Sequence, residues 1–145
     1  MQNWGWIAIP IIIGLIQPVI WQMTIRLAKV FGDMPASVIL HLIGTLAGAL
    51  LIAMGLRGGN GQIESIPWWA WFGGAIGVCS IWLLNMGLPK LGVATFMALL
   101  VASQLIAGLV FDGYGLMGTE VRRIQWFHWI GVLFLAVGAY LVSRS

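Results

Sequence analysis

The residues best able to do chemistry in this chain are uncharged polar side chains within long apolar stretches. Amides, hydroxyls and one imidazole interrupt those stretches, at Gln17, Gln22, Thr24, His41, Thr45, Ser80, Asn85, Thr95, Ser103 and Gln104. Because a polar side chain is costly to leave against lipid, each is expected to point into a helix bundle. There it would either hydrogen-bond another helix or orient a ligand.

Six side chains are candidates for the wall of a substrate cavity, namely Gln17, Trp21, His41, Trp82, Asn85 and Gln104. The amides and the imidazole would exchange hydrogen bonds with a ligand. The indole rings would offer flat faces to a cationic or planar ligand, although ordinary packing is an equal alternative for both tryptophans.

Two residues are candidates for coupling transport to protons or cations. His41 is the in-membrane side chain able to exchange a proton near neutral pH. Asp112 directly follows the fourth apolar stretch and is the carboxylate nearest the expected rim of the cavity. The other acidic residues, Asp33, Glu64 and Glu120, also fall in loops or at the ends of apolar stretches.

Catalysis has little support in the sequence. We find no metalloprotease HExxH, nucleophile elbow, phosphate-binding loop or dinucleotide fingerprint. A lone cysteine, Cys79, cannot by itself form a metal site, so no metal or other cofactor is expected. Apart from Arg122–Arg123 the basic residues are scattered singly, which argues against a nucleic acid partner. The protein is therefore not expected to be an enzyme.

The composition identifies lipid as the solvent of most of this chain. Of its 145 residues, 61% are hydrophobic and 8% are charged, whereas a soluble domain carries about 25% charged residues. About 20 apolar residues cross a bilayer as a helix. The sequence predicts an all-α integral membrane protein, with one transmembrane domain over 1–145 and spans at about 4–28, 35–56, 67–88, 91–111 and 124–142.

Local signals predict how these spans begin, bend and end. Asp33 is placed to cap the second helix, and Pro89-Lys90 is expected to form the tight turn before the fourth. Pro10 and Pro18 fall inside the first span, which is expected to be kinked or locally unwound there. A break beside Gln17 would open a polar cavity, whereas a simple bend would not.

The basic residues give the chain almost no preferred orientation. Five spans place Arg57, Arg122 and Arg123 on the side of the N-terminus, and Arg26, Lys29, Lys90 and Arg144 on the other. Orientation follows the Lys/Arg excess of short loops, and three against four is nearly even. Such balance suits a chain that inserts both ways and forms an antiparallel homodimer. A fixed orientation with a weak bias is the alternative.

Tryptophans mark one membrane surface. Seven of them, Trp4, Trp6, Trp68, Trp69, Trp71, Trp126 and Trp129, gather at the starts of the first, third and fifth spans. These starts all lie on one side, where indole rings favour the level of the lipid headgroups.

A family resemblance enters at the third and fourth spans. Pro67-Trp-Trp-Ala-Trp-Phe-Gly-Gly74, Leu88-Pro-Lys-Leu-Gly-Val-Ala-Thr95 and the stretch from Ser103-Gln-Leu to Phe-Asp112-Gly-Tyr-Gly-Leu116 resemble the YdcZ-type branch of the drug/metabolite transporter superfamily. That resemblance implies half of a ten-helix inverted-repeat bundle, completed by a second copy or a paired homologue. More distantly, the chain resembles the small multidrug resistance proteins, but it lacks their first-span glutamate.

The resemblance and the residues together lead to one functional expectation. The chain is expected to be a secondary transporter of a small organic solute in a bacterial inner membrane, working by alternating access as an inverted homodimer. A non-transporting helical adaptor or subunit of a larger membrane complex is the alternative, and an ion channel is a third.

Overall fold

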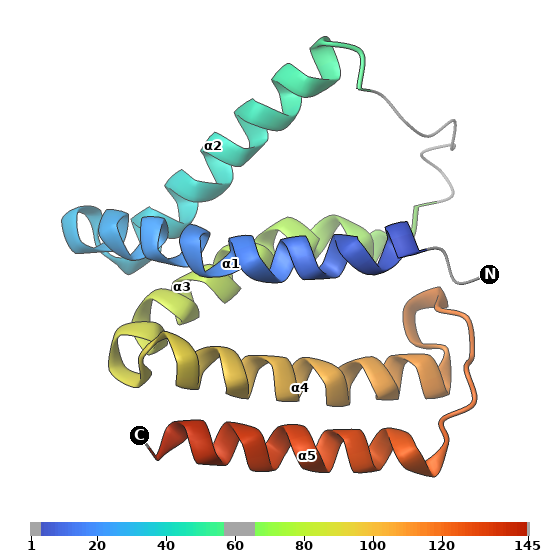
Figure 1. The fold of residues 1–145 in the computed structure, drawn as a ribbon. Coiled ribbons are helices and arrows are strands. Elements are labelled where there is room, and N and C mark those ends of the chain that lie inside the picture. Colours follow the sequence, from blue (N-terminus) through green and yellow to red (C-terminus); the bar gives the residue numbers. More distant parts are fainter. Residues whose placement is uncertain (1–3, 57–65, 145) are drawn as a thin grey trace. The chain divides into compact units, whose positions relative to one another are not determined.

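The structure, a computed structural model, describes residues 4–56 and 66–144, with side chains described from residue 8 onward. In these ranges the chain is helical and contains no strand. Its elements in chain order are α1 (Trp4–Phe31), α2 (Asp33–Ala53), the 3₁₀ turn η2 (Trp68–Phe72), α3 (Gly73–Leu91), α4 (Val93–Tyr114), the 3₁₀ turn η3 (Leu116–Gly118) and α5 (Trp126–Ser143) (Figure 1).

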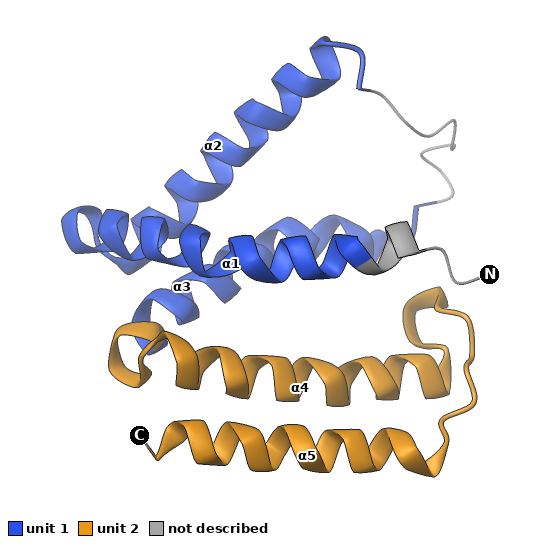
Figure 2. Ribbon diagram, viewed as in Figure 1, with its two compact units in different colours: residues 1–87 blue, residues 88–145 orange. Residues whose placement is uncertain are grey.

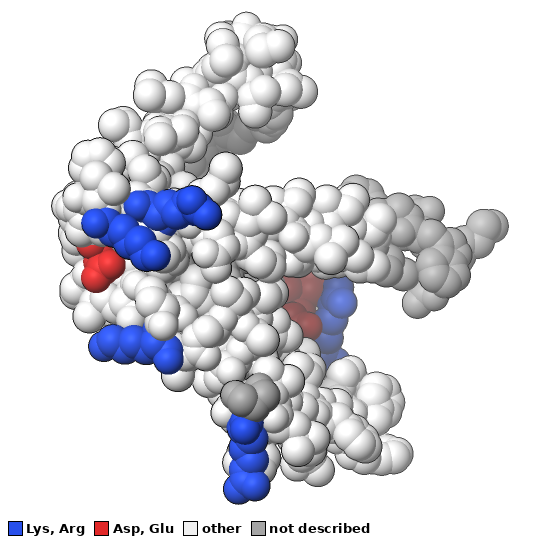
Figure 3. Space-filling view, turned by 60° about the vertical axis from the view of Figure 1, so that its left-hand side comes forward, with Lys and Arg blue, Asp and Glu red and all other residues white. Residues whose placement is uncertain are grey.

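Within the described ranges, five helical segments are long and apolar enough to cross a membrane, counting η2 and α3 as one. This confirms the predicted all-α, five-span class. Most of their large apolar side chains are exposed, as lipid-facing side chains are. The charged side chains visible in Figure 3 gather toward helix ends and loops and leave long uncharged flanks between them.

The described helices divide between two compact units, residues 1–87 and residues 88–145 (Figure 2). The first unit contains α1, α2 and all of α3 except its last turn. The second contains that last turn, α4, η3 and α5. The single transmembrane domain over 1–145 stays a prediction.

Single glycines make the two tightest turns. Gly32, with φ of 93°, separates α1 from α2, and Gly92, with φ of 76°, separates α3 from α4. A side chain is strained at such positive φ values, so glycine suits both positions. Two local predictions were wrong. Asp33 is the first residue of α2 and gives no side-chain cap, and Pro89-Lys90 lies inside α3 rather than forming the turn.

The first helix is continuous through both of its prolines. Residues 4–31 are helical throughout, so the expected local unwinding beside Gln17 does not occur. A proline removes one main-chain hydrogen bond, and in a membrane helix neighbouring groups compensate for that loss. The break that would have opened a cavity at Gln17 is therefore absent from α1.

The core of the first unit lies where α1, α2 and α3 approach one another. Helices α1 and α2 pack together after the Gly32 turn, and Trp21, Ile25, Ala36 and Leu84 are buried there. In the second unit α4 and α5 pack antiparallel (Figure 1) and bury Leu109 and Ala139. Small residues such as Ala36 and Ala139 allow close approach of helices in lipid.

Candidate functional site

Two polar side chains tie α2 to α3. The hydroxyl of Ser37 donates a 2.6 Å hydrogen bond to the main-chain carbonyl of Val78. The side-chain amide of Asn85 donates a 3.0 Å hydrogen bond to the carbonyl of Asp33. Ser37 is fully buried and Asn85 is 2% exposed. The first half of α2 is thus bonded to α3 through groups that lipid would leave unpaired.

His41 lies in the same contact, one turn after Ser37. Its Nδ1 lies 2.8 Å from the carbonyl oxygen of Ser37, which can only accept, so Nδ1 carries the proton and donates. Its Nε2 is 2.9 Å from the point where a Cβ on Gly77 would stand. The absence of a side chain at Gly77 is therefore what allows the half-buried imidazole to lie against α3.

Among the described residues of this unit, two buried polar atoms have no hydrogen-bond partner: the hydroxyl oxygen of Thr24 and the side-chain carbonyl oxygen of Asn85. Thr24 is fully buried in α1. An unsatisfied buried polar group costs about 1–3 kcal/mol. Buried polar atoms in native proteins are normally hydrogen-bonded. A bound solute or a second chain would supply the missing hydrogen bonds of these two atoms.

The predicted site residues divide between the two units. Trp21 and Asn85 are buried in the first unit, at 2% exposure each. Gln17, His41 and Trp82 are half-buried in that unit. Of these five, His41 and Asn85 both lie in the contact between α2 and α3, but about two helical turns apart, since Asn85 bonds Asp33 and His41 lies against Gly77. Gln104 is exposed on α4 in the second unit.

Asp112 lies inside α4, within its last turn, and not just past the span as the sequence suggested. Helix α4 extends to Tyr114 because Gly115, with φ of 63°, ends it there. The main-chain carbonyl of Asp112 accepts a 2.8 Å hydrogen bond from the N–H of Arg122. This bond fastens the start of the α4–α5 connection to its far end.

Two residues of this arrangement were not among the candidates for the cavity wall. Ser37 precedes His41 by four residues, and Thr24 follows Trp21 by three. Residues three or four apart share a helix face. The sequence signal for Ser37 and Thr24 was therefore their helical spacing from the candidates His41 and Trp21.

The fold and these buried groups define a multi-pass integral membrane protein whose interior, over the described residues, is mostly apolar with a few uncharged polar side chains. Residues 5–141 match the family described as "Putative inner membrane exporter, YdcZ". The chain is also 34% identical over 110 residues to the inner membrane protein YdcZ of Escherichia coli strain K12, a match that covers 71% of this chain and 72% of that protein. No solved structure matches the chain.

The chain therefore belongs to the YdcZ family of inner membrane transporters. This confirms the resemblance seen at the third and fourth spans and the expected location in an inner membrane.

Proposed function

We propose that the protein is a secondary transporter of a small organic solute, acting by alternating access as an inverted homodimer. The observation that carries this proposal is the pair of unpartnered buried oxygens, on Thr24 and Asn85, in two membrane-spanning helices of one unit. Each residue lies past the middle of its span. If the five spans alternate in direction, α1 and α3 cross the membrane the same way, and the two oxygens would then lie at a similar depth.

The chemistry of these groups limits the solute. The Asn85 oxygen accepts hydrogen bonds only, and the Thr24 hydroxyl both donates and accepts. A matching solute carries an N–H or O–H donor. No carboxylate stands in the described parts of α1 or α3 to act as a counter-ion, because Asp33 begins α2 and Asp112 belongs to α4. Selection would therefore depend on hydrogen bonding and on the indole faces of Trp21 and Trp82.

Inversion would supply the second half of the route. Transporters built from inverted repeats place their binding site at the repeat interface near the midplane. Five spans give one such half, and the near-even distribution of basic residues lets a second copy insert upside down. In this arrangement separation of the helices that bury Thr24 and Asn85 would open both residues of each copy to a shared site. A paired homologue would fill the same place as the second copy.

The contact between α2 and α3 is the element that we propose to open and close. It depends on few polar groups: Ser37, His41 and Asn85. Protonation would add a second N–H to the imidazole of His41, at the nitrogen that faces Gly77. A positively charged imidazole is costly to keep half-buried between two membrane helices, so proton binding would favour separation of α2 and α3. Asp112 is the second candidate for coupling.

Uptake into proteoliposomes tests the proposal. The purified chain would be reconstituted and offered radiolabelled amino acids, small amines and sugars, with and without a pH gradient. We expect saturable flux of at least one solute, reduced in Asn85→Ala and preserved in Ser80→Ala, whose exposed hydroxyl bonds only the carbonyl of Ile76 in its own helix. His41→Gln is expected to remove the response to the gradient.

Three outcomes would contradict the proposal. Absence of saturable flux across the panel, together with co-purification of one heterologous membrane protein, would favour the adaptor. Steady conductance in a planar bilayer would favour a channel. Chains that pair only in the same orientation would remove the inverted homodimer even if flux is observed.

A further inference from the structure

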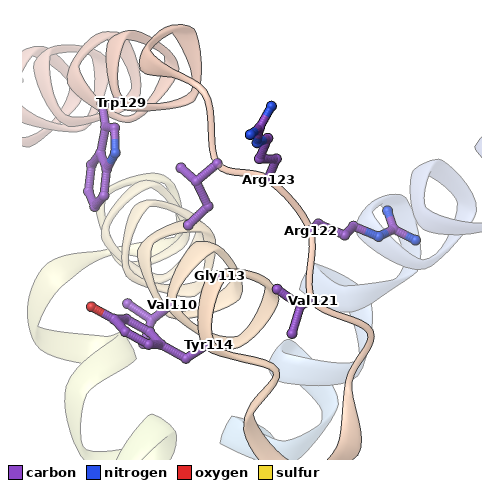
Figure 4. Close-up of a pocket in the computed structure, with 8 residues that line it drawn as sticks. Val110, Gly113, Tyr114, Val121, Arg122, Arg123 and Trp129 are labelled. Atoms are coloured by element: carbon purple, nitrogen blue, oxygen red, sulfur yellow. The ribbon is translucent and has the colours of Figure 1, made fainter.

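A second feature of the molecule lies entirely within the second unit, at the end where α4 passes into α5. A cavity of about 630 Å³ is lined there by Val110, Gly113, Tyr114, Val121, Arg122, Arg123, Ile124 and Trp129 (Figure 4). All eight residues belong to α4, to α5 or to the connection between them. The volume falls in the range of small-molecule sites.

The cavity stands at the membrane surface, since it is formed where one span ends at Tyr114 and the next begins at Trp126. Its two aromatic residues have the amphipathic rings that favour the headgroup level. In Figure 4 the rings of Tyr114 and Trp129 extend to the same side of the connection, with Val110 beside Tyr114. One wall of the cavity is therefore apolar and aromatic.

The other wall carries two positive charges that have no carboxylate partner among the described residues. Arg122 and Arg123 are exposed, and their guanidinium groups extend outward from the connection in different directions (Figure 4). Across the described residues neither forms an ion pair, and the nearby acidic residues Asp112 and Glu120 do not line the cavity. The partial positive charge at the start of α5 adds to this wall. Guanidinium groups bind phosphate through paired hydrogen bonds.

The apolar wall continues past the cavity along the membrane-facing surface. Leu133 lies one turn beyond Trp129 on α5, and Ile106 lies one turn before Val110 on α4. Leu133 is 62% exposed and Ile106 is 42% exposed. A ligand with its anionic group at the arginines would meet an uncovered apolar track leading into the bilayer. A soluble anion would make no use of that track.

From this geometry we infer that the cavity is a binding site for an anionic phospholipid. The phosphodiester lies beside Arg122 and Arg123, whose guanidinium groups turn toward it on binding. Tyr114 and Trp129 flank the glycerol region, and an acyl chain follows Ile106 and Leu133. Basic pockets between membrane helices bind such headgroups. The site shares none of the residues of the first unit on which the proposed transport route rests, because every residue in it belongs to residues 88–145.

Lipid counting by native mass spectrometry tests the site. The full chain, freed of lipid in neutral detergent, would be titrated with dioleoyl phosphatidylglycerol or with dioleoyl phosphatidylcholine. We expect a preference for phosphatidylglycerol that falls about 25-fold in Arg122→Gln/Arg123→Gln, since each basic residue near an anionic surface contributes about fivefold. The control Arg26→Gln/Lys29→Gln removes two exposed positive charges elsewhere and should keep the preference.

Two further measurements distinguish binding of a lipid from binding of a free anion and from general charge attraction. Trp129→Ala should weaken binding of the long-chain lipid more than that of dihexanoyl phosphatidylglycerol, and inorganic phosphate at millimolar concentration should not displace the long-chain lipid. Displacement by phosphate would overturn the lipid assignment. Equal binding of the two headgroup classes, or equal losses in the two charge-removing variants, would overturn the site itself.

Discussion

Asn85 on α3 holds the first residue of α2, because its side-chain amide donates a 3.0 Å hydrogen bond to the carbonyl of Asp33. The same side chain keeps its own carbonyl oxygen buried and unpartnered. Asn85 is thus both a link between two helices and a candidate ligand for a solute. Substitutions at this residue and around it can separate the two roles.

Asn85→Ala should reduce the free energy of unfolding in mixed micelles by about 1 kcal/mol, the usual net value of one hydrogen bond. The loss is limited because the substitution also removes the unpartnered oxygen. Solute flux in proteoliposomes should fall much further than this stability change explains. A variant that unfolds more readily but transports at the rate of the wild type would assign Asn85 to packing alone.

Thr24→Val should move stability and transport in opposite directions. Valine has nearly the shape of threonine but lacks the hydroxyl, so the cost of burying that unpartnered group disappears. We expect an unchanged or higher free energy of unfolding, by up to about 1 kcal/mol, together with reduced solute flux. Thermal unfolding in detergent and initial rates of uptake measure the two effects. Unaltered flux would show that the Thr24 hydroxyl does not meet the solute.

Gly77→Ala should destabilise the contact between α2 and α3 by about 1 kcal/mol. The added Cβ would stand 2.9 Å from Nε2 of His41, and moving the imidazole strains its hydrogen bond to the carbonyl of Ser37. Gly74→Ala is the matched control, three residues earlier on α3, where a Cβ meets nothing within 4 Å. In a double-mutant cycle, Gly77→Ala should cost little unfolding free energy when it is made in the His41→Ala variant, because the clash with the imidazole is then absent. Additive losses would mean that the two residues do not touch.

Ser37→Ala should cost about 0.5–1.5 kcal/mol of unfolding free energy, since it removes the buried 2.6 Å hydrogen bond to the Val78 carbonyl. Ser80→Ala removes a hydroxyl that is exposed and bonded within its own helix, so that variant should be close to neutral. Chemical unfolding of both variants in mixed micelles gives the comparison. Equal effects at the two positions would contradict the link between α2 and α3.

The orientation of the chain in the membrane should change when the positive charges of Arg122 and Arg123 are removed. Arg122→Gln/Arg123→Gln lowers the basic residues on the N-terminal side from three to one, against four on the other. The side with more basic residues stays in the cytoplasm, so C-terminal reporters should change from signals in both compartments to a cytoplasmic signal alone. Glu120→Gln in the same connection should change nothing, because acidic residues have little influence. A wild-type chain that reports from one compartment only would exclude dual insertion.

Much of the helical layout follows from the sequence. Long apolar stretches predicted the five spans to within a few residues at each end, because crossing a bilayer requires a length of apolar chain that can be counted directly. The errors were local. Pro89 and Asp33 were assigned to a turn and a cap, whereas the flanking glycines Gly92 and Gly32 make both turns through positive φ.

The sequence alone determined that this is a helical membrane protein of five spans and that its polar groups at membrane depth are uncharged. Only the tertiary structure decided which of those groups meet: Ser37 with Val78, Asn85 with Asp33, and His41 with Gly77. In a soluble helix an apolar stripe marks the buried face. Here the helices are apolar all round, since lipid covers what the core does not, and the facing surfaces are chosen by close packing and hydrogen bonds between residues distant in the chain.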